Sequence, residues 1–131
     1  KLVMPGIVCM NAKKFTDYNN AKKELEIFNE QLVPEILNMK ELPMIVVCDD
    51  SDFTAANLRN FLWVTFTRCN PAKDIYGIDS FYENKHWGCN GPVVIDARIK
   101  PHHAPPVEKD AATEKRIERI FNKGGSLYGC I

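Results

Sequence analysis

The sequence feature that most constrains the fold is an unbroken apolar run at residues 44–48, Met-Ile-Val-Val-Cys, followed at once by Asp49 and Asp50. A strand with one solvent-exposed face alternates apolar and polar residues, and these five successive apolar residues do not. They indicate a strand that is covered on both faces. A sheet that is covered on both faces by helices is typical of an α/β domain.

The rest of the chain supplies further strands and helices. Three more strands are expected, at residues 2–10 (interrupted near the start by Pro5-Gly6), 75–78 and 93–99. Three helices are expected to begin at side chains that can accept from free N–H groups, which are Thr16 or Asp17, Asp52 or Thr54, and Asp110. Residues 81–92 and the proline-rich residues 100–106 are expected to be irregular. This order predicts an α/β fold with a mixed sheet of about four strands, flanked by about three helices.

The middle helix should present one apolar stripe to the core and end before a proline. The stripe at helical spacing consists of Leu58, Phe61, Leu62, Thr65 and Phe66. Pro71 disfavours a helical conformation at the residue before it, so the helix should stop near Arg68 or Cys69. The helix dipole favours a cation at this end. We predict that Arg68 ties the helix end to a neighbouring carboxylate or carbonyl.

Composition narrows the functional classes. The 131 residues suit one domain, and 17 basic and 17 acidic residues give a net charge of +0. A balanced charge gives no basic surface for nucleic acid. No apolar run approaches the roughly 18 residues of a membrane span. Five cysteines are scattered without a Cys-x-x-Cys pair, which favours a reducing, cytoplasmic compartment.

Two groups of residues could carry metal or thiol chemistry. His86-x-x-Cys89 has the spacing of half a zinc site, but the adjacent pair His102-His103 makes a poor second half because neighbouring side chains diverge. Cys89 beside His86 could also be a thiol nucleophile. We interpret all four as polar loop residues and expect no catalytic residue and no metal ligand in this chain. A small metal or thiol enzyme built on His86 and Cys89 remains a third hypothesis.

The acidic turn after the apolar run is the other candidate for cation binding. Asp49, Asp50 and Asp52 lack the alternating ligands, the glycine and the distal glutamate of an EF-hand loop. Acids directly after a strand are also typical of helix N-caps. We therefore interpret them as capping residues. No nucleophile elbow, phosphate-binding loop or dinucleotide-binding glycine pattern is present.

Three sequence blocks together resemble the C-terminal domain of the UbiD-like carboxy-lyase family. The pattern Trp63-x-x-x-Thr67-Arg68-Cys69-x-Pro71-x-x-Asp74 resembles a signature of that domain. Residues 45–50 resemble its strand and acidic turn, and residues 93–97 resemble its strand that ends in Asp-Ala. Order and spacing agree over residues 1–125. Residues 87–103 are most similar to the branch that acts on phenolic or aromatic acids, including phenylphosphate carboxylase-type subunits.

The resemblance implies reversible, non-oxidative decarboxylation of aromatic or phenolic acids. The family uses prenylated FMN with a divalent metal, usually manganese, and often potassium. Its catalytic acids and arginine and its metal ligands lie on a preceding flavin-binding domain, which no segment here matches. We therefore expect residues 1–131 to be one C-terminal domain, with a helix and tail at 107–131, that is inactive alone and binds no cofactor alone. The missing initiator Met fits a fragment of a larger enzyme.

The implied role of such a domain is to close one side of the cofactor cleft as a hinged lid and to supply an oligomer interface. Its expected partners are the preceding domain, further copies of the chain or other carboxylase subunits. A stand-alone assembly subunit of a multi-subunit carboxylase is the alternative.

One position departs from the family pattern. Some members carry a lysine just before the strand at residues 93–97, where it reaches the flavin phosphate. Pro92 stands at that position and offers neither a charge nor an N–H. Phosphate contact is therefore expected from Lys100 or Arg98, or is absent. The alternative for Lys100 is a solvated side chain after a strand.

Overall fold

The computed structural model describes residues 1–36, 42–104 and 110–130, and these form a five-stranded mixed sheet, a separate hairpin and four helices. The sheet order is β1 (Leu2–Met4), β2 (Ile7–Asn11), β3 (Met44–Cys48), β7 (Val93–Asp96) and β4 (Ile75–Gly77). The three central strands β2, β3 and β7 are parallel, and the two edge strands are antiparallel to their neighbours. The prediction of an α/β fold with a mixed sheet is confirmed.

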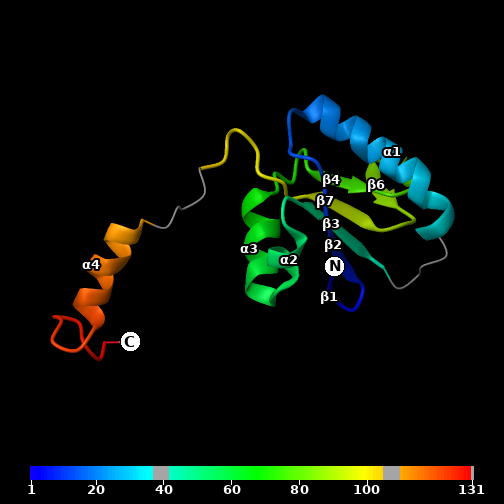
Figure 1. The fold of residues 1–131 in the computed structure, drawn as a ribbon. Helices are drawn as coiled ribbons and strands as arrows, with labels where there is room; N and C mark the ends of the chain where they lie inside the picture. The colour runs from blue at the N-terminus through cyan, green and yellow to red at the C-terminus, as the bar shows by residue number, and fades with distance from the viewer. Residues whose placement is uncertain (37–41, 105–109, 131) are drawn as a thin grey trace.

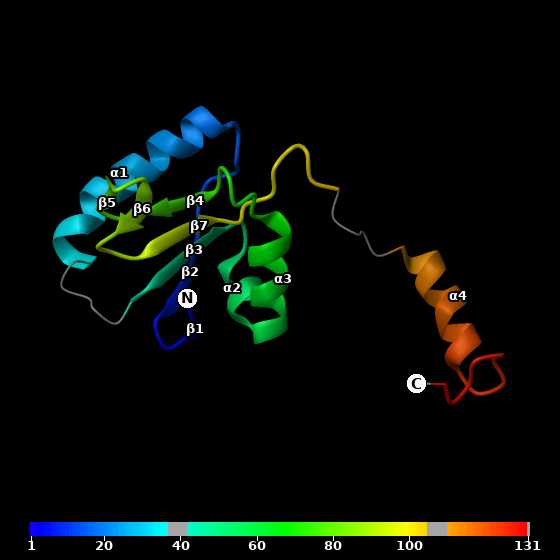
Figure 2. The ribbon, with the colours of Figure 1, turned by 180° about the vertical axis from the view of Figure 1, so that it is seen from behind.

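Helices cover both faces of this sheet. Helix α1 (Tyr18–Ile36) lies over one face, and α2 (Ser51–Ala55) and α3 (Leu58–Arg68) lie over the other (Figures 1 and 2). Strand β3 sends Ile45 and Val47 into the cluster under α1, and Val46 and Cys48 into the cluster under α3. The unbroken apolar run is therefore explained by burial on both sides.

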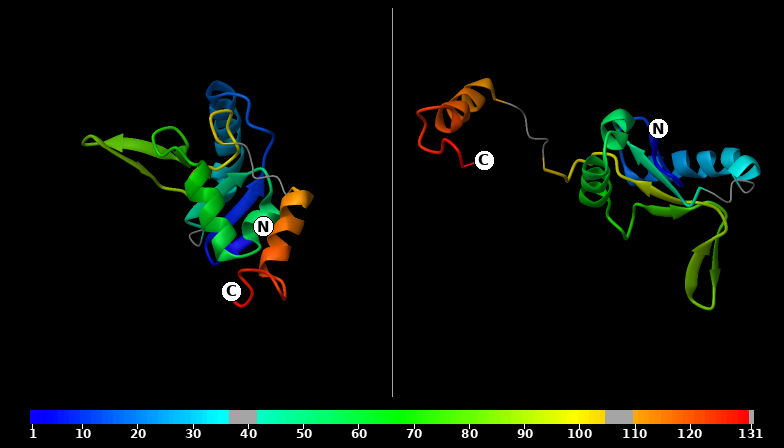
Figure 3. Two further views of the ribbon diagram at one scale, coloured as in Figure 1. Left: turned by 90° about the vertical axis from the view of Figure 1, so that its left-hand side faces the viewer. Right: turned by 90° about the horizontal axis from the view of Figure 1, so that it is seen from below.

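Two expected segments differ from the observed elements. Residues 2–10 form two antiparallel strands, because the chain reverses at Pro5-Gly6, where Gly6 adopts a φ of 83°. Residues 81–92 are not a loop. They contribute most of a hairpin of β5 (Ser80–Glu83) and β6 (His86–Cys89), which projects from the sheet (Figure 3). Its turn places Asn84 and Lys85 at φ of 50° and 67°, as a two-residue hairpin turn requires.

The helix boundaries were predicted in part. Asp17 accepts from the N–H groups of Asn19 and Asn20, and Asp110 caps α4 (Ala111–Phe121) as expected. The predicted cap at Asp52 or Thr54 is wrong, because the chain forms two helices there. Asp50 caps α2 and Asn57 caps α3. Helix α3 ends at Arg68, as the following proline predicts.

Helix α3 is rotated relative to the predicted stripe. Phe61, Val64 and Thr65 are buried, whereas Leu58, Leu62 and Phe66 are exposed. Together with α2, this leaves a surface that we call the outer apolar face, formed by Phe53, Leu58, Leu62, Trp63 and Phe66. These five side chains are 43–68% exposed.

Helix α4 lies apart from the sheet in Figures 1 and 2, and none of its residues is buried. Its apolar residues Ile117, Ile120 and Phe121 are exposed or only partly buried. Within the part of the chain that the structure describes, no helix is long and apolar enough to cross a membrane.

Candidate functional site

The carboxyl ends of β2, β3 and β7 meet at one edge of the sheet, because these strands are parallel. This is the edge at which open α/β sheets bind ligands. Strand β7 ends at Asp96, earlier than predicted, and the segment after it carries both residues that the sequence nominated, Arg98 and Lys100. The structure brings these two cations together with buried acids.

Arg98 is enclosed by carboxylates and a carbonyl. Its Nε donates to Asp96 Oδ1 over 3.0 Å, and its Nη2 donates to Asp96 Oδ2 over 2.8 Å. Nη1 donates to the Lys13 carbonyl and to Glu24 Oε2, each over 2.8 Å. Burial lowers the pKa of Arg98, but the hydrogen bonds and charges of Asp96 and Glu24 outweigh it and raise that pKa. Arg98 is therefore a permanent cation inside the fold.

Lys100 is equally enclosed. Its Nζ lies 3.2 Å from Asp74 Oδ2 and donates to the Asp96 carbonyl over 2.8 Å and to the Arg68 carbonyl over 3.2 Å. Asp74 Oδ2 also accepts from the Asn70 N–H over 2.6 Å. The alternative of a solvated Lys100 is wrong, because Asp74, distant in sequence, draws the ammonium into the interior.

We call Asp74, Asp96, Arg98 and Lys100 the charge cluster. All four residues are at most 1% exposed, and their formal charges cancel. Buried ions persist when each is paired and hydrogen-bonded. The cluster ties the loop before β4 to the segment after β7.

Contact between a flavin phosphate and Arg98 or Lys100 stays a prediction. In the described structure, the N–H groups of both side chains point at carboxylates and carbonyls inside the domain. As arranged, Lys100 and the Nε and Nη2 groups of Arg98 do not fit a phosphate, because it would have to displace the buried acids Asp74 and Asp96. Of the three described acids that pair with these two cations, only Glu24, on Nη1 of Arg98, is partly exposed.

Arg68 performs the structural role that the sequence predicts. Its Nη1 lies 3.4 Å from Asp49 Oδ2, and its guanidinium carbon lies 5.1 Å from the centre of the Trp63 ring. Asp49 Oδ2 also accepts from the Ile99 N–H over 2.7 Å. This acid thus joins the end of β3 to the segment after β7, instead of standing free for a cation.

His86 and Cys89 lie on a different segment of the fold from His102 and His103. His86 and Cys89 belong to the projecting hairpin, and burial raises the pKa of the Cys89 thiol, which opposes thiolate formation. His103 accepts from the Lys100 N–H through Nδ1 over 3.1 Å. Within the residues that are described, no group of three or more His, Cys, Asp or Glu residues could hold a metal ion.

Two acids of the site were not predicted from the sequence. Asp74 is the last residue of the pattern that resembles the family signature, but nothing in the sequence marked it as the partner of Lys100. Glu24 lies among the charged residues of α1, where a solvated side chain is expected. Only the tertiary structure places it on Arg98.

Comparison with known proteins gives matches among curated sequences. No protein-family model and no solved structure matches the chain. The chain is 36% identical over 85 residues to one of the subunits of a 4-hydroxybenzoate decarboxylase of Chlamydia pneumoniae, a UbiD-family enzyme; the match covers 65% of this chain and 15% of that protein.

Two further relatives carry no functional name. The chain is 29% identical over 99 residues to an uncharacterized protein of Chlamydia muridarum, covering 76% of this chain and 17% of that protein. It is 29% identical over 94 residues to an uncharacterized protein of Chlamydia caviae, and this match covers 70% of this chain and 16% of that protein. The chain thus spans only 15–17% of the length of these relatives.

Proposed function

We propose that this chain is the C-terminal domain of a UbiD-like, prenylated-FMN-dependent reversible (de)carboxylase of aromatic or phenolic acids. The observation that carries the proposal is the 36% identity over 85 residues to a 4-hydroxybenzoate decarboxylase subunit. The chain corresponds to a small part of that relative. The remaining polypeptide would supply the flavin site, the manganese and potassium sites and the catalytic residues.

Within this enzyme, the chain would act as a lid on the cofactor cleft and as an oligomerisation domain. The two acids and two bases of the charge cluster form ion pairs with one another. These pairs stiffen the domain, and none of the four residues is free for proton transfer. A rigid body suits a lid that closes as a unit and excludes water from the bound acid.

The outer apolar face supports the proposed contact with another domain or subunit. Trp63 and Phe66 are 50% and 68% exposed, and Phe53 packs edge-on against Trp63 with ring centres 6.2 Å apart. Soluble domains rarely leave a contiguous surface of large apolar side chains in water unless a partner covers it.

The mass of the native polypeptide tests whether the chain is part of a larger enzyme. Antibodies raised against residues 42–104 would isolate the polypeptide from its source for intact-mass measurement. The proposal predicts a mass far above 14.9 kDa, the mass of this chain. A native polypeptide of 14.9 kDa would refute a fused domain and favour an assembly subunit of a multi-subunit carboxylase.

A further inference from the structure

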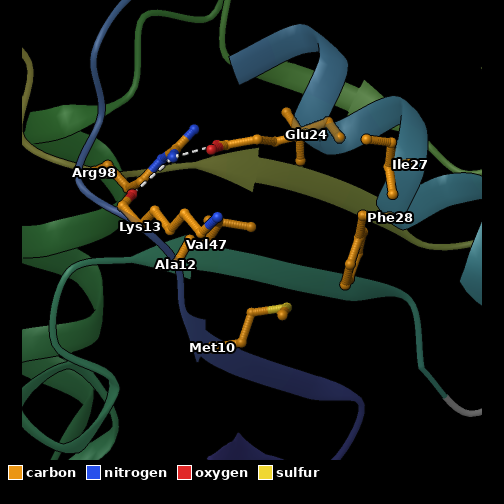
Figure 4. Close-up of a pocket in the computed structure, with 9 residues that line it drawn as sticks. Met10, Ala12, Lys13, Glu24, Ile27, Phe28, Val47 and Arg98 are labelled. Atoms are coloured by element: carbon orange, nitrogen blue, oxygen red, sulfur yellow. Dashed lines mark hydrogen bonds and ion pairs between the residues drawn. The ribbon is translucent and has the colours of Figure 1, made fainter. Parts of the chain in front are cut away.

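A cavity of about 290 Å³ lies between α1 and strands β2 and β3 (Figure 4). Its walls are the apolar side chains of Met10, Ala12, Leu25, Ile27, Phe28 and Val47. Three charged residues, Lys13, Glu24 and Arg98, complete the lining, and in Figure 4 they lie together near one end. We propose that this cavity binds a small apolar carboxylic acid, whose carboxylate replaces that of Glu24 on Arg98. The inference does not rest on the proposed function.

The cavity exists because α1 covers only part of its face of the sheet. Leu25 packs with Ile45 and Val47 of β3 and Val94 of β7. Strand β2 lies beyond β3 in the sheet, and Met10 on its α1 side and Ala12 just after its end remain only partly buried. The result is an apolar floor suited to the hydrocarbon part of a ligand.

Arg98 provides the anion-binding group at the charged end. Asp96 occupies Nε and Nη2, whereas Nη1 is directed at the Lys13 carbonyl and Glu24 (Figure 4). The side chains of Arg98 and Asp96 are each 1% exposed, but that of Glu24 is 42% exposed. Of these two acids, only Glu24 can swing into water without uncovering a buried charge.

Charge balance makes this exchange feasible. The charge cluster is already neutral without Glu24, so Glu24 is an additional carboxylate on a cation that Asp96 balances. A ligand carboxylate would accept the same charge-assisted hydrogen bond from Nη1. Lys13 at the cavity adds a second positive charge that favours an anion over a neutral ligand.

Octanoate is a suitable probe, because it joins one carboxylate to a flexible apolar chain. Titration into the ¹⁵N-labelled full chain, followed by NMR, should shift the amide resonances of Met10, Ala12 and Phe28. Glu24→Gln removes the competing charge and should tighten octanoate binding at least tenfold. The matched control is Glu26→Gln, which removes the same charge from the same helix at a residue paired with Lys22; it should leave the affinity unchanged.

Two further measurements test the two halves of the ligand. Uncharged 1-octanol should bind at least tenfold more weakly than octanoate, and inorganic phosphate should shift none of these resonances. Ala12→Leu, which fills part of the cavity, should weaken octanoate binding at least fivefold, and it provides a test should Glu24→Gln fail to fold.

The inference is overturned if Glu24→Gln folds and leaves octanoate affinity unchanged or lower. Equal binding of octanol, equal shifts with phosphate, or octanoate shifts outside the cavity would also overturn it. If the cavity resonances instead move with protein concentration alone, a second copy of the chain covers this surface and the acid site is wrong.

Discussion

Lys100 and Asp74 form an ion pair that is closed to solvent. The Lys100 Nζ lies 3.2 Å from Asp74 Oδ2, and the two side chains are 0% and 1% exposed. Asp74 precedes edge strand β4, and Lys100 follows β7, the neighbour of β4 in the sheet. The backbone supports the same junction, because the Asp96 N–H donates to the Asp74 carbonyl over 2.9 Å. The pair therefore fixes the edge of the sheet to its central part.

Removing one member of this pair should be strongly destabilising. Asp74→Ala leaves a buried ammonium without its carboxylate, and the free energy of unfolding should fall by about 3–5 kcal/mol. Urea denaturation measures the change. Lys14→Met, at an exposed lysine, should change the same quantity by at most about 0.5 kcal/mol. A loss below about 1 kcal/mol for Asp74→Ala would show that the pair is not closed as described.

The pair between Asp49 and Arg68 should be less costly to break, and asymmetrically so. Arg68→Ala loses one long ion pair and the contact with Trp63, at a cost of about 1 kcal/mol. Asp49→Ala also leaves the Ile99 N–H without its acceptor, so the free energy of unfolding should fall by about 2–3 kcal/mol. Thermal or urea unfolding of both variants shows which of them loses more stability. Equal losses would mean that the Ile99 hydrogen bond contributes little.

Local sequence signals predicted the centre of the fold well. The apolar run predicted the buried strand β3, and the proline after α3 predicted where that helix ends. Both signals act between neighbouring residues in the sequence, and both predictions agree with the structure. The hairpin of β5 and β6 was missed because its Asn84-Lys85 turn lacks the glycine that usually marks such a turn. The stripe of α3 was misplaced because its apolar residues cover more than one face, and only packing selects the buried one.

The outer apolar face should govern the solubility of the isolated chain. Phe66→Lys places a charge on the most exposed member of the face, so it should reduce self-association while changing the free energy of unfolding by at most about 0.5 kcal/mol. Sedimentation velocity across a concentration series measures association. Thr67→Lys adds the same charge at the next, exposed position and should have a smaller effect. Equal effects of the two variants would assign the association to net charge instead of this face.

Tyr76 should make the domain sensitive to alkali. Burial, with a smaller contribution from the charges of Asp96 and Asp74, raises the pKa of Tyr76 from 10.0 to about 12. A raised pKa favours the neutral phenol in the folded state, so this contribution to stability is complete below pH 10 and is lost as the pH rises towards 12.

The variant Tyr76→Phe should therefore lose stability less steeply than the unmodified chain between pH 10 and 12. Urea denaturation at a series of pH values gives the slope. Tyr82→Phe, at a hairpin tyrosine that is 81% exposed, serves as the control and should follow the unmodified chain. If Tyr76→Phe has the slope of that control, the phenol of Tyr76 is not protected from ionisation.

The candidate site was less accessible to sequence reasoning than the fold. Arg98 and Lys100 were nominated through a family pattern, but their partners Glu24 and Asp74 lie far away in the sequence. No local periodicity connects an acid on α1 to a cation after β7. Asp96 lies close to both cations in the sequence, but one carboxylate cannot balance two buried charges, and only the tertiary structure adds Asp74 and Glu24.

The most direct test of the central claim is a decarboxylation assay of the isolated chain. The purified protein would be given prenylated FMN, Mn²⁺, K⁺ and 4-hydroxybenzoate, with release of CO₂ measured against a full-length enzyme that carries this domain. We predict no release above background from the chain alone and turnover by the full-length enzyme. Sustained CO₂ release by the isolated chain would contradict the claim, because the reactive groups would then lie on these 131 residues.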